Sequence, residues 1–190
     1  MQHKCKVTVI DKKLYPELQQ RYCADPQSGP CPCYNVGDEF VFERYGAADD
    51  FWHIGAGTLR TPGASGTAGG EGLAHCSEAW DAIARYIYTA LQGGSIMRGW
   101  MNDERVMIAC CSDGTRPVIF KIERLDYKAV HVPGLESAEK AASLSSALAA
   151  LPGVSSVAVR AEEGFIEVYV DGTVPDEAIR AAVPEAVRID

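Results

Sequence analysis

The residues of this chain best suited to chemistry are its cysteines, because a thiolate is both a nucleophile and a ligand for soft metal ions. The chain has 190 residues and seven cysteines, all of which precede residue 112. An odd number of cysteines without an export signal argues against a disulfide framework. We therefore expect free thiols, and five lie in expected loops or at the ends of expected elements: Cys31, Cys33, Cys76, Cys110 and Cys111.

The segment "GPCPCYNVG" at residues 29–37 carries two of these thiols in a Pro- and Gly-rich loop. A disulfide between Cys31 and Cys33 is strained because only one residue separates them. The pair is therefore a candidate for holding a soft ligand such as zinc, another soft metal ion or an iron–sulfur cluster. The alternative is a loop with two incidental thiols, since common zinc and cluster patterns use Cys-x-x-Cys.

Cys76 directly precedes an expected helix at residues 77–92. Free N–H groups and the helix dipole stabilise a thiolate at such a position. With His75 beside it, and His53 able to approach through a loop, Cys76 is the candidate nucleophile of a cysteine-dependent redox enzyme. The alternative is a packed, inert thiol followed by an ordinary helix.

Cys110 and Cys111 end an apolar run before the Asp113-Gly114 turn. Neighbouring residues of a strand point to opposite faces, so the two thiols are expected in different environments. Both faces of the run are apolar, which predicts a hairpin covered on both sides. Arg116 is either a turn partner of Asp113 or a cation that holds a neighbouring thiolate or an anionic ligand.

The first half of the chain supplies strands and one helix to position these thiols. Alternating residues predict strands at 5–10 and 38–43, with Cys5 on the buried face of the first. The hairpin strands are expected at 105–111 and 117–124. The glycine-rich segment 55–72 is expected to be a mobile loop. Together these elements predict a small, strand-rich α+β domain over residues 1–126.

Residues 127–190 contain no cysteine and follow a different pattern. Strands are expected at 127–132, 156–161, 165–170 and 187–189, and helices at 137–151 and 175–183. This βαββαβ order is that of a ferredoxin-like sandwich, in which two helices cover one face of a four-stranded sheet. The predicted fold class is therefore α+β, with the strand-rich domain followed by a separate ferredoxin-like domain.

Two stretches of the second half carry a resemblance: Gly134-Leu135, and "LPGV" at residues 151–154. Through them, most of residues 133–179 resembles the heavy-metal-associated domain of copper chaperones and metal-pumping ATPases. The two metal-binding cysteines of that family fall on Ser137 and Lys140 here. The resemblance thus implies the fold without its metal site, and a role in homodimer formation or in docking a protein partner.

The first half carries a second resemblance through "KCKVTVI", "GPCPCYNVGDEFVF", "CSEAWDAIARYI" and "CCSDGTRPVIFKIER". These stretches cover most of residues 4–124. They are similar to a family of small uncharacterised cysteine-containing proteins found largely in anaerobic microbes. The resemblance implies no particular activity.

Composition narrows the classes of function. The formal net charge is −8 with no basic run, which argues against binding to nucleic acid or to an anionic membrane surface. The longest apolar run, residues 106–111, is too short to span a bilayer, and a cytoplasmic location is expected. We thus expect a two-domain cytosolic protein that binds a metal or redox ligand through thiolates. The alternatives are a structural or regulatory interaction protein with core cysteines and a cysteine-dependent redox enzyme.

Overall fold

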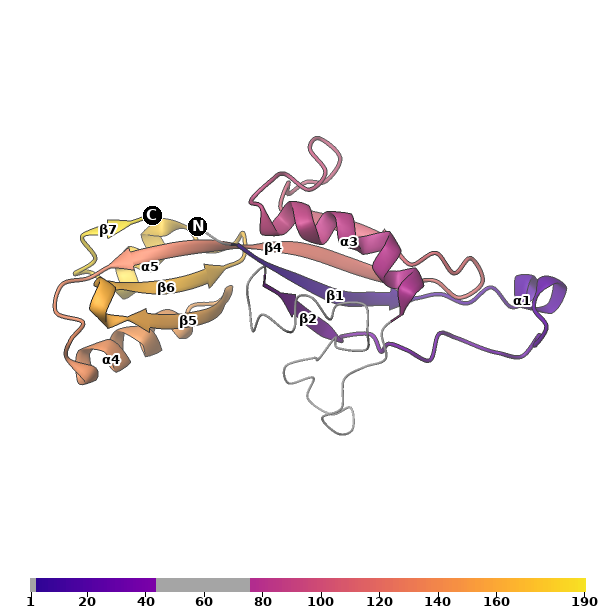
Figure 1. Ribbon diagram of the computed structural model, residues 1–190, viewed down its shortest axis with the longest axis horizontal. Coiled ribbons are helices and arrows are strands. Elements are labelled where there is room, and N and C mark those ends of the chain that lie inside the picture. Colours follow the sequence, from indigo (N-terminus) through magenta and orange to yellow (C-terminus); the bar gives the residue numbers. More distant parts are fainter. Residues whose placement is uncertain (1–2, 44–75) are drawn as a thin grey trace. The chain divides into compact units, whose positions relative to one another are not determined.

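The computed structural model describes residues 3–43 and 76–190. The expectations for His53, His75 and the segment 55–72 lie outside these residues. Within the described residues, seven strands form one antiparallel sheet in the order β2-β1-β4-β6-β5, and β3 and β7 each pair with β4 (Figure 1). The strands are β1 (Lys4–Lys12), β2 (Glu39–Phe42), β3 (Val106–Cys110), β4 (Val118–His131), β5 (Val154–Arg160), β6 (Phe165–Val170) and β7 (Arg188–Ile189).

The predicted fold class, with a separate ferredoxin-like βαββαβ domain, is wrong because of β4. The strands expected at 117–124 and 127–132 are one continuous strand of 14 residues. Its first part pairs with β3, and its second part pairs with β6 and β7. The two residues between these parts, Arg124 and Leu125, are neither glycine nor proline, so nothing in the backbone ends the strand there.

Contacts divide the chain into two compact units that share β4. The first, Cys5–Arg124, contains every cysteine and is here named the thiol unit. The second, the C-terminal unit, consists of Leu125–Asp190 and the N-terminal end of the chain up to Lys4. Each unit has its own hydrophobic core.

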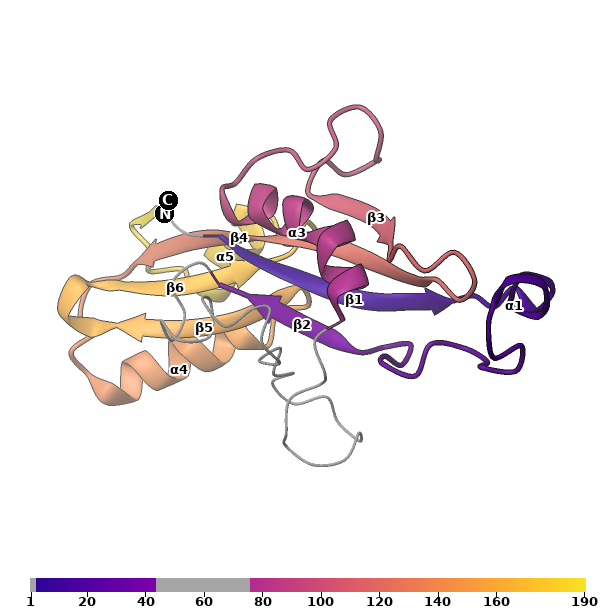
Figure 2. The same ribbon diagram turned by 45° about the vertical axis from the view of Figure 1, so that its right-hand side comes forward.

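The core of the thiol unit lies between its strands and helix α3 (Ser77–Leu91), which crosses one face of the sheet (Figure 2). Alternate residues of β1 point into this core, including Cys5 and Val7, which are 0% and 1% exposed. The helix predicted at 77–92 is confirmed, and its buried residues Ile83 and Ile87 recur at helical spacing. A short helix α1 (Pro16–Tyr22) was not predicted, although proline at its first position is a known start signal.

The C-terminal unit buries helices α4 (Ala138–Ala149) and α5 (Asp176–Ala182) against β4, β5 and β6. Leu148 of α4 and Ile179 of α5 are fully buried in the same core as Ile166 and Val168 of β6. Ser137 is the N-cap of α4, and its side chain accepts a hydrogen bond from the Lys140 backbone N–H. None of the helices in the described residues is long and apolar enough to cross a membrane.

Candidate functional site: a cluster of thiols beside Arg116

The loop that carries Cys31 and Cys33 is anchored on both sides. On the side nearer α1, the buried Gln19 amide donates to the Gly29 carbonyl (3.0 Å) and accepts from the Gly29 N–H (3.2 Å). On the other side, Lys12 Nζ donates to the Tyr34 carbonyl (2.6 Å). Long-range bonds therefore hold a segment that has no regular secondary structure of its own.

Cys31 and Cys33 lie side by side in this loop. Both are partly buried against the core of the thiol unit, and their side chains interact with each other. Burial raises the pKa of the Cys33 thiol, and its electrostatic interaction with Cys31 and Cys76 raises this pKa further. The positive charge of Arg116 acts on the pKa of Cys33 in the opposite direction.

Cys76 is the N-cap of α3, with extended backbone angles (φ −100°, ψ 109°). Tyr34, the residue that directly follows Cys33, interacts electrostatically with Cys76. Tyr34 is 3% exposed and packs edge-on against Phe40 and Phe120, with ring centroids 5.8 and 5.5 Å away. Tyr34 thus packs the end of the Cys31–Cys33 loop into the core of the thiol unit.

Cys111 enters the same neighbourhood from the end of β3. It is 6% exposed, and its sulfur accepts a hydrogen bond from the Val118 N–H at 3.3 Å. Burial raises the pKa of the Cys111 thiol, and the electrostatic interaction with Cys31 and Cys76 raises this pKa further. Cys33 and Cys111 each interact electrostatically with Cys31 and with Cys76, and we name these four residues the thiol cluster.

Arg116 is the cation beside the thiol cluster. Its Nε donates to Asp113 Oδ2 at 3.0 Å, and its backbone N–H donates to Asp113 Oδ1 at 3.1 Å. Partial burial acts to raise the pKa of Asp113, but the hydrogen bonds from Thr115 and Arg116 outweigh burial and lower this pKa. The guanidinium interacts favourably with Cys31 and Cys33, so Arg116 is both a turn partner of Asp113 and a neighbour of the thiols.

Three cysteines lie outside the thiol cluster. Cys110 is exposed, Cys5 is buried in the core, and Cys23 follows α1 as its C-cap. The two hairpin thiols do occupy opposite faces, but the expectation that both faces are covered is wrong. Ile108 is 37% exposed and Cys110 is open to solvent, because α3 packs only on the other face of the sheet.

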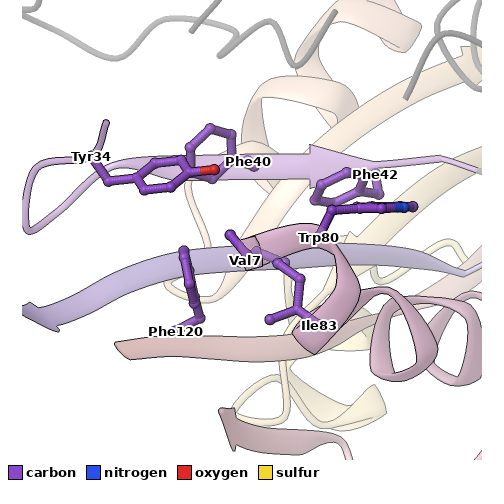
Figure 3. A pocket seen from close by; sticks show the side chains of 8 residues that line it. Val7, Tyr34, Phe40, Phe42, Trp80, Ile83 and Phe120 are labelled. Carbon is purple, nitrogen blue, oxygen red and sulfur yellow. The ribbon is translucent and has the colours of Figure 1, made fainter. Parts of the chain in front are cut away.

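A small cavity lies next to Tyr34, between the strands and the first turns of α3 (Figure 3). Its volume is about 10 Å³, room for about one water molecule, so it does not hold a small organic substrate. The cavity walls are aromatic and aliphatic: Val7, Tyr34, Phe40, Phe42, Ala79, Trp80, Ile83 and Phe120.

Across residues 3–43 and 76–190, no group of three or more His, Cys, Asp and Glu side chains is arranged to hold a metal ion. All seven cysteines are free. The assignment of Cys31, Cys33, Cys76, Cys110 and Cys111 as metal ligands remains a prediction, and the structure separates Cys110 from the other four. His75, the expected helper of Cys76, lies outside the described residues.

Sequence reasoning did not single out Tyr34 as part of this site. Its place directly after the Cys-Pro-Cys triplet, before an alternating strand, was the available signal. Comparison of the chain with models of protein families found no match, and comparisons with curated proteins and with solved structures found none. Both family resemblances noted from the sequence therefore remain predictions.

Proposed function

We propose that this protein is a thiol redox module whose reacting pair is Cys31 and Cys33. The observation that carries this proposal is that the two thiols, one residue apart, are both partly buried against the same core and interact electrostatically in a loop anchored on both sides. Adjacent, partly accessible thiols are the arrangement needed for reversible disulfide formation. An ion needs several converging ligands, and the described residues offer no such preformed group.

The reaction is thiol–disulfide exchange with a small or protein disulfide, RSSR. Cys31 is the attacking thiol, because burial raises the pKa of the Cys33 thiol and so disfavours the thiolate of Cys33. A Cys31–S–S–R bond forms and one RS⁻ leaves. Cys33 then loses its proton, attacks the Cys31 sulfur and displaces the second RS⁻. The protein dithiol is oxidised by two electrons and RSSR is reduced to two RSH.

The product disulfide spans one intervening residue and is strained. Strained disulfides have higher reduction potentials and exchange readily, as regulatory and catalytic disulfides do. The positive charge of Arg116 lowers the pKa of Cys33 and so favours the thiolate that Cys33 must form to close the disulfide. These properties suit a centre that passes oxidising equivalents on, and they do not suit a permanent crosslink.

The test uses full-length protein, reduced and kept anaerobic, and then exposed to oxidised glutathione. Wild type should lose two hydrogens per chain by intact mass. The variant C33S should stop at a glutathione adduct on Cys31, and C31S should react at least about tenfold more slowly because it lacks the attacking thiol. The exposed Cys110 lies outside the thiol cluster, so C110S is the matched control and should form the Cys31–Cys33 disulfide at the wild-type rate, although it lacks any glutathione adduct at residue 110. Oxidation that proceeds equally in C31S, C33S and wild type would refute the proposal.

A second candidate function is the binding of a soft metal ion or an iron–sulfur cluster by the same thiols. Its support is that the four residues of the thiol cluster come from three separate segments, as metal ligands commonly do. Elemental analysis and absorbance spectra of anaerobically purified wild type, C31S and C76S test it. Less than about a tenth of an equivalent of metal in wild type, with no charge-transfer band, rejects this candidate.

A further inference from the structure

The sheet of the thiol unit has a second face, opposite α3, which we name the open face (Figure 2). Strand alternation brings side chains of β1, β2, β3 and β4 to this face, and three of the large apolar ones are exposed. Ile10 of β1 is 41% exposed, and Val41 of β2 and Ile108 of β3 are each 37% exposed. Exposed apolar side chains gathered on one face are typical of a protein interaction surface.

The charged side chains at the centre of the open face are paired with one another. Lys6 Nζ lies 3.6 Å from Glu123 Oε2 and 3.9 Å from Glu39 Oε1. Lys121 Nζ lies 2.9 Å from the same Glu123 oxygen. Two lysines therefore balance two glutamates, and the centre of the open face is neutral, whereas the whole chain has a formal net charge of −8.

The order of the strands makes the open face complementary to itself. β1 and β4 are neighbours in the middle of this part of the sheet, with β2 beside β1 and β3 beside β4. Lys6 of β1 lies beside Glu123 of β4. Because the two strands run antiparallel, Ile10, four residues after Lys6, lies near Ile119, four residues before Glu123.

We propose that two copies of this chain associate through their open faces. A two-fold axis parallel to the strands, between β1 and β4, places Lys6 of one copy opposite the partner's Glu123, and Glu123 opposite the partner's Lys6. The same axis places Ile10 opposite the partner's Ile119. Unlike charges thus face each other at one end and apolar side chains at the other, as a two-fold interface requires of a single patch.

A second copy fits the open face better than a strongly charged partner does. Nucleic acid and anionic lipid require an excess of positive charge where they bind, and the centre of this face has none. The net charge of −8 makes two copies repel each other, so they associate best through a surface that adds no like charge. Four strands span only about 20 Å, less than an interface that buries about 800 Å² per partner. We therefore expect a dimer that dissociates on dilution.

Sedimentation equilibrium of the reduced, full-length protein tests this proposal. The apparent mass of wild type should rise from one 20.5 kDa chain toward twice that mass as the concentration increases from about 1 to about 500 µM. Ile10→Glu buries an unpaired charge in the interface and should raise the dissociation constant of the dimer at least about tenfold. Val187 of the C-terminal unit is 68% exposed, so Val187→Glu is the matched control and should dimerise as wild type does.

Charge-reversed variants test the two-fold axis itself. K6E alone and E123K alone place like charges opposite each other, so each should dimerise less than wild type. An equimolar mixture of the two should recover the dimer, because unlike charges then meet again across the interface. Circular dichroism checks that each variant is folded, and Ile10→Glu, at an exposed position, decides the test if the buried Glu123 does not tolerate lysine.

Three results would overturn the proposal. The first is a wild-type protein that stays monomeric over the whole range of concentration. The second is a dimer that Ile10→Glu leaves as strong as Val187→Glu does. The third is a mixture of folded K6E and E123K that associates no more than either variant alone.

Discussion

Replacing Gly153 by alanine should destabilise the C-terminal unit through two separable effects. Gly153 has φ +90°, a backbone conformation that residues with a side chain rarely adopt. An added Cβ would lie 2.5 Å from Asp171 Oδ1, 2.5 Å from Thr173 Oγ1 and 2.7 Å from Val174 Cγ2. The Asp171 carboxylate cannot turn away freely, because it accepts hydrogen bonds from the Thr173 N–H and hydroxyl.

The magnitude can be worked from these two effects. Forcing a non-glycine residue into a left-handed conformation costs about 1–2 kcal/mol. Displacing packed neighbours to relieve an overlap costs about 1–3 kcal/mol more. Gly153→Ala should therefore lower the free energy of unfolding by about 2–5 kcal/mol.

Gly164→Ala is the matched control for this substitution. Gly164 also has a positive φ, +72°, but no atom lies within 4 Å of its added Cβ. This control should lose only the conformational part, about 1–2 kcal/mol. Urea unfolding followed by circular dichroism measures both variants against wild type. Equal losses in the two variants would show that the close contacts around Gly153 contribute nothing and would refute the reasoning.

Three further predictions concern the thiol unit. In the native reduced protein, iodoacetamide should label the exposed Cys110 before the buried Cys111. Peptide mass spectrometry at successive times measures the order of labelling. The reverse order would contradict the faces of β3 to which the two residues are assigned. The pKa of Asp113 is lower in the folded state than the unfolded value of about 3.9. The ionised carboxylate therefore stabilises the folded protein at pH values above about 3.9, and this stabilisation is lost as the pH falls through the folded-state pKa. The stability advantage of wild type over D113N should accordingly shrink between about pH 6 and pH 2, and an unchanged difference would exclude this linkage. Arg124 Nη1 donates to two backbone carbonyls just after α3, both at 2.8 Å. Arg124→Met should lower the free energy of unfolding by about 1–3 kcal/mol, as measured by urea unfolding. A decrease below the error of the method would show that these hydrogen bonds contribute little to stability.

Local patterns in the sequence were sufficient for several features. The helical spacing of apolar residues predicted the C-terminal end of α3 to within one residue. The alternation of side chains along a strand predicted that Cys110 and Cys111 lie on opposite faces. Both patterns depend on backbone geometry that repeats every few residues, so a short stretch of sequence carries them. The position of the seven thiols, all before residue 112, is likewise a property of the sequence.

Other features depended on contacts between distant parts of the chain. Whether β4 continues past Arg124 depends on the strands available to pair with it, and β3, β6 and β7 all come from other segments. Whether one face or both faces of the hairpin are covered depends on where α3 packs, and the sequence of α3 alone does not determine this position. This is why the continuous sheet and the open face of Cys110 were not predicted.

The sequence by itself determined which residues have thiols to react and which short elements carry them. Only the tertiary structure decided how the loop with Cys31 and Cys33 is held, through anchors such as Gln19 to Gly29 and Lys12 to Tyr34. The physical reason is that the loop bearing Cys31 and Cys33 has no repeating backbone hydrogen bonds of its own. Its conformation is set by long-range bonds and burial, and these exist only once the whole unit has folded.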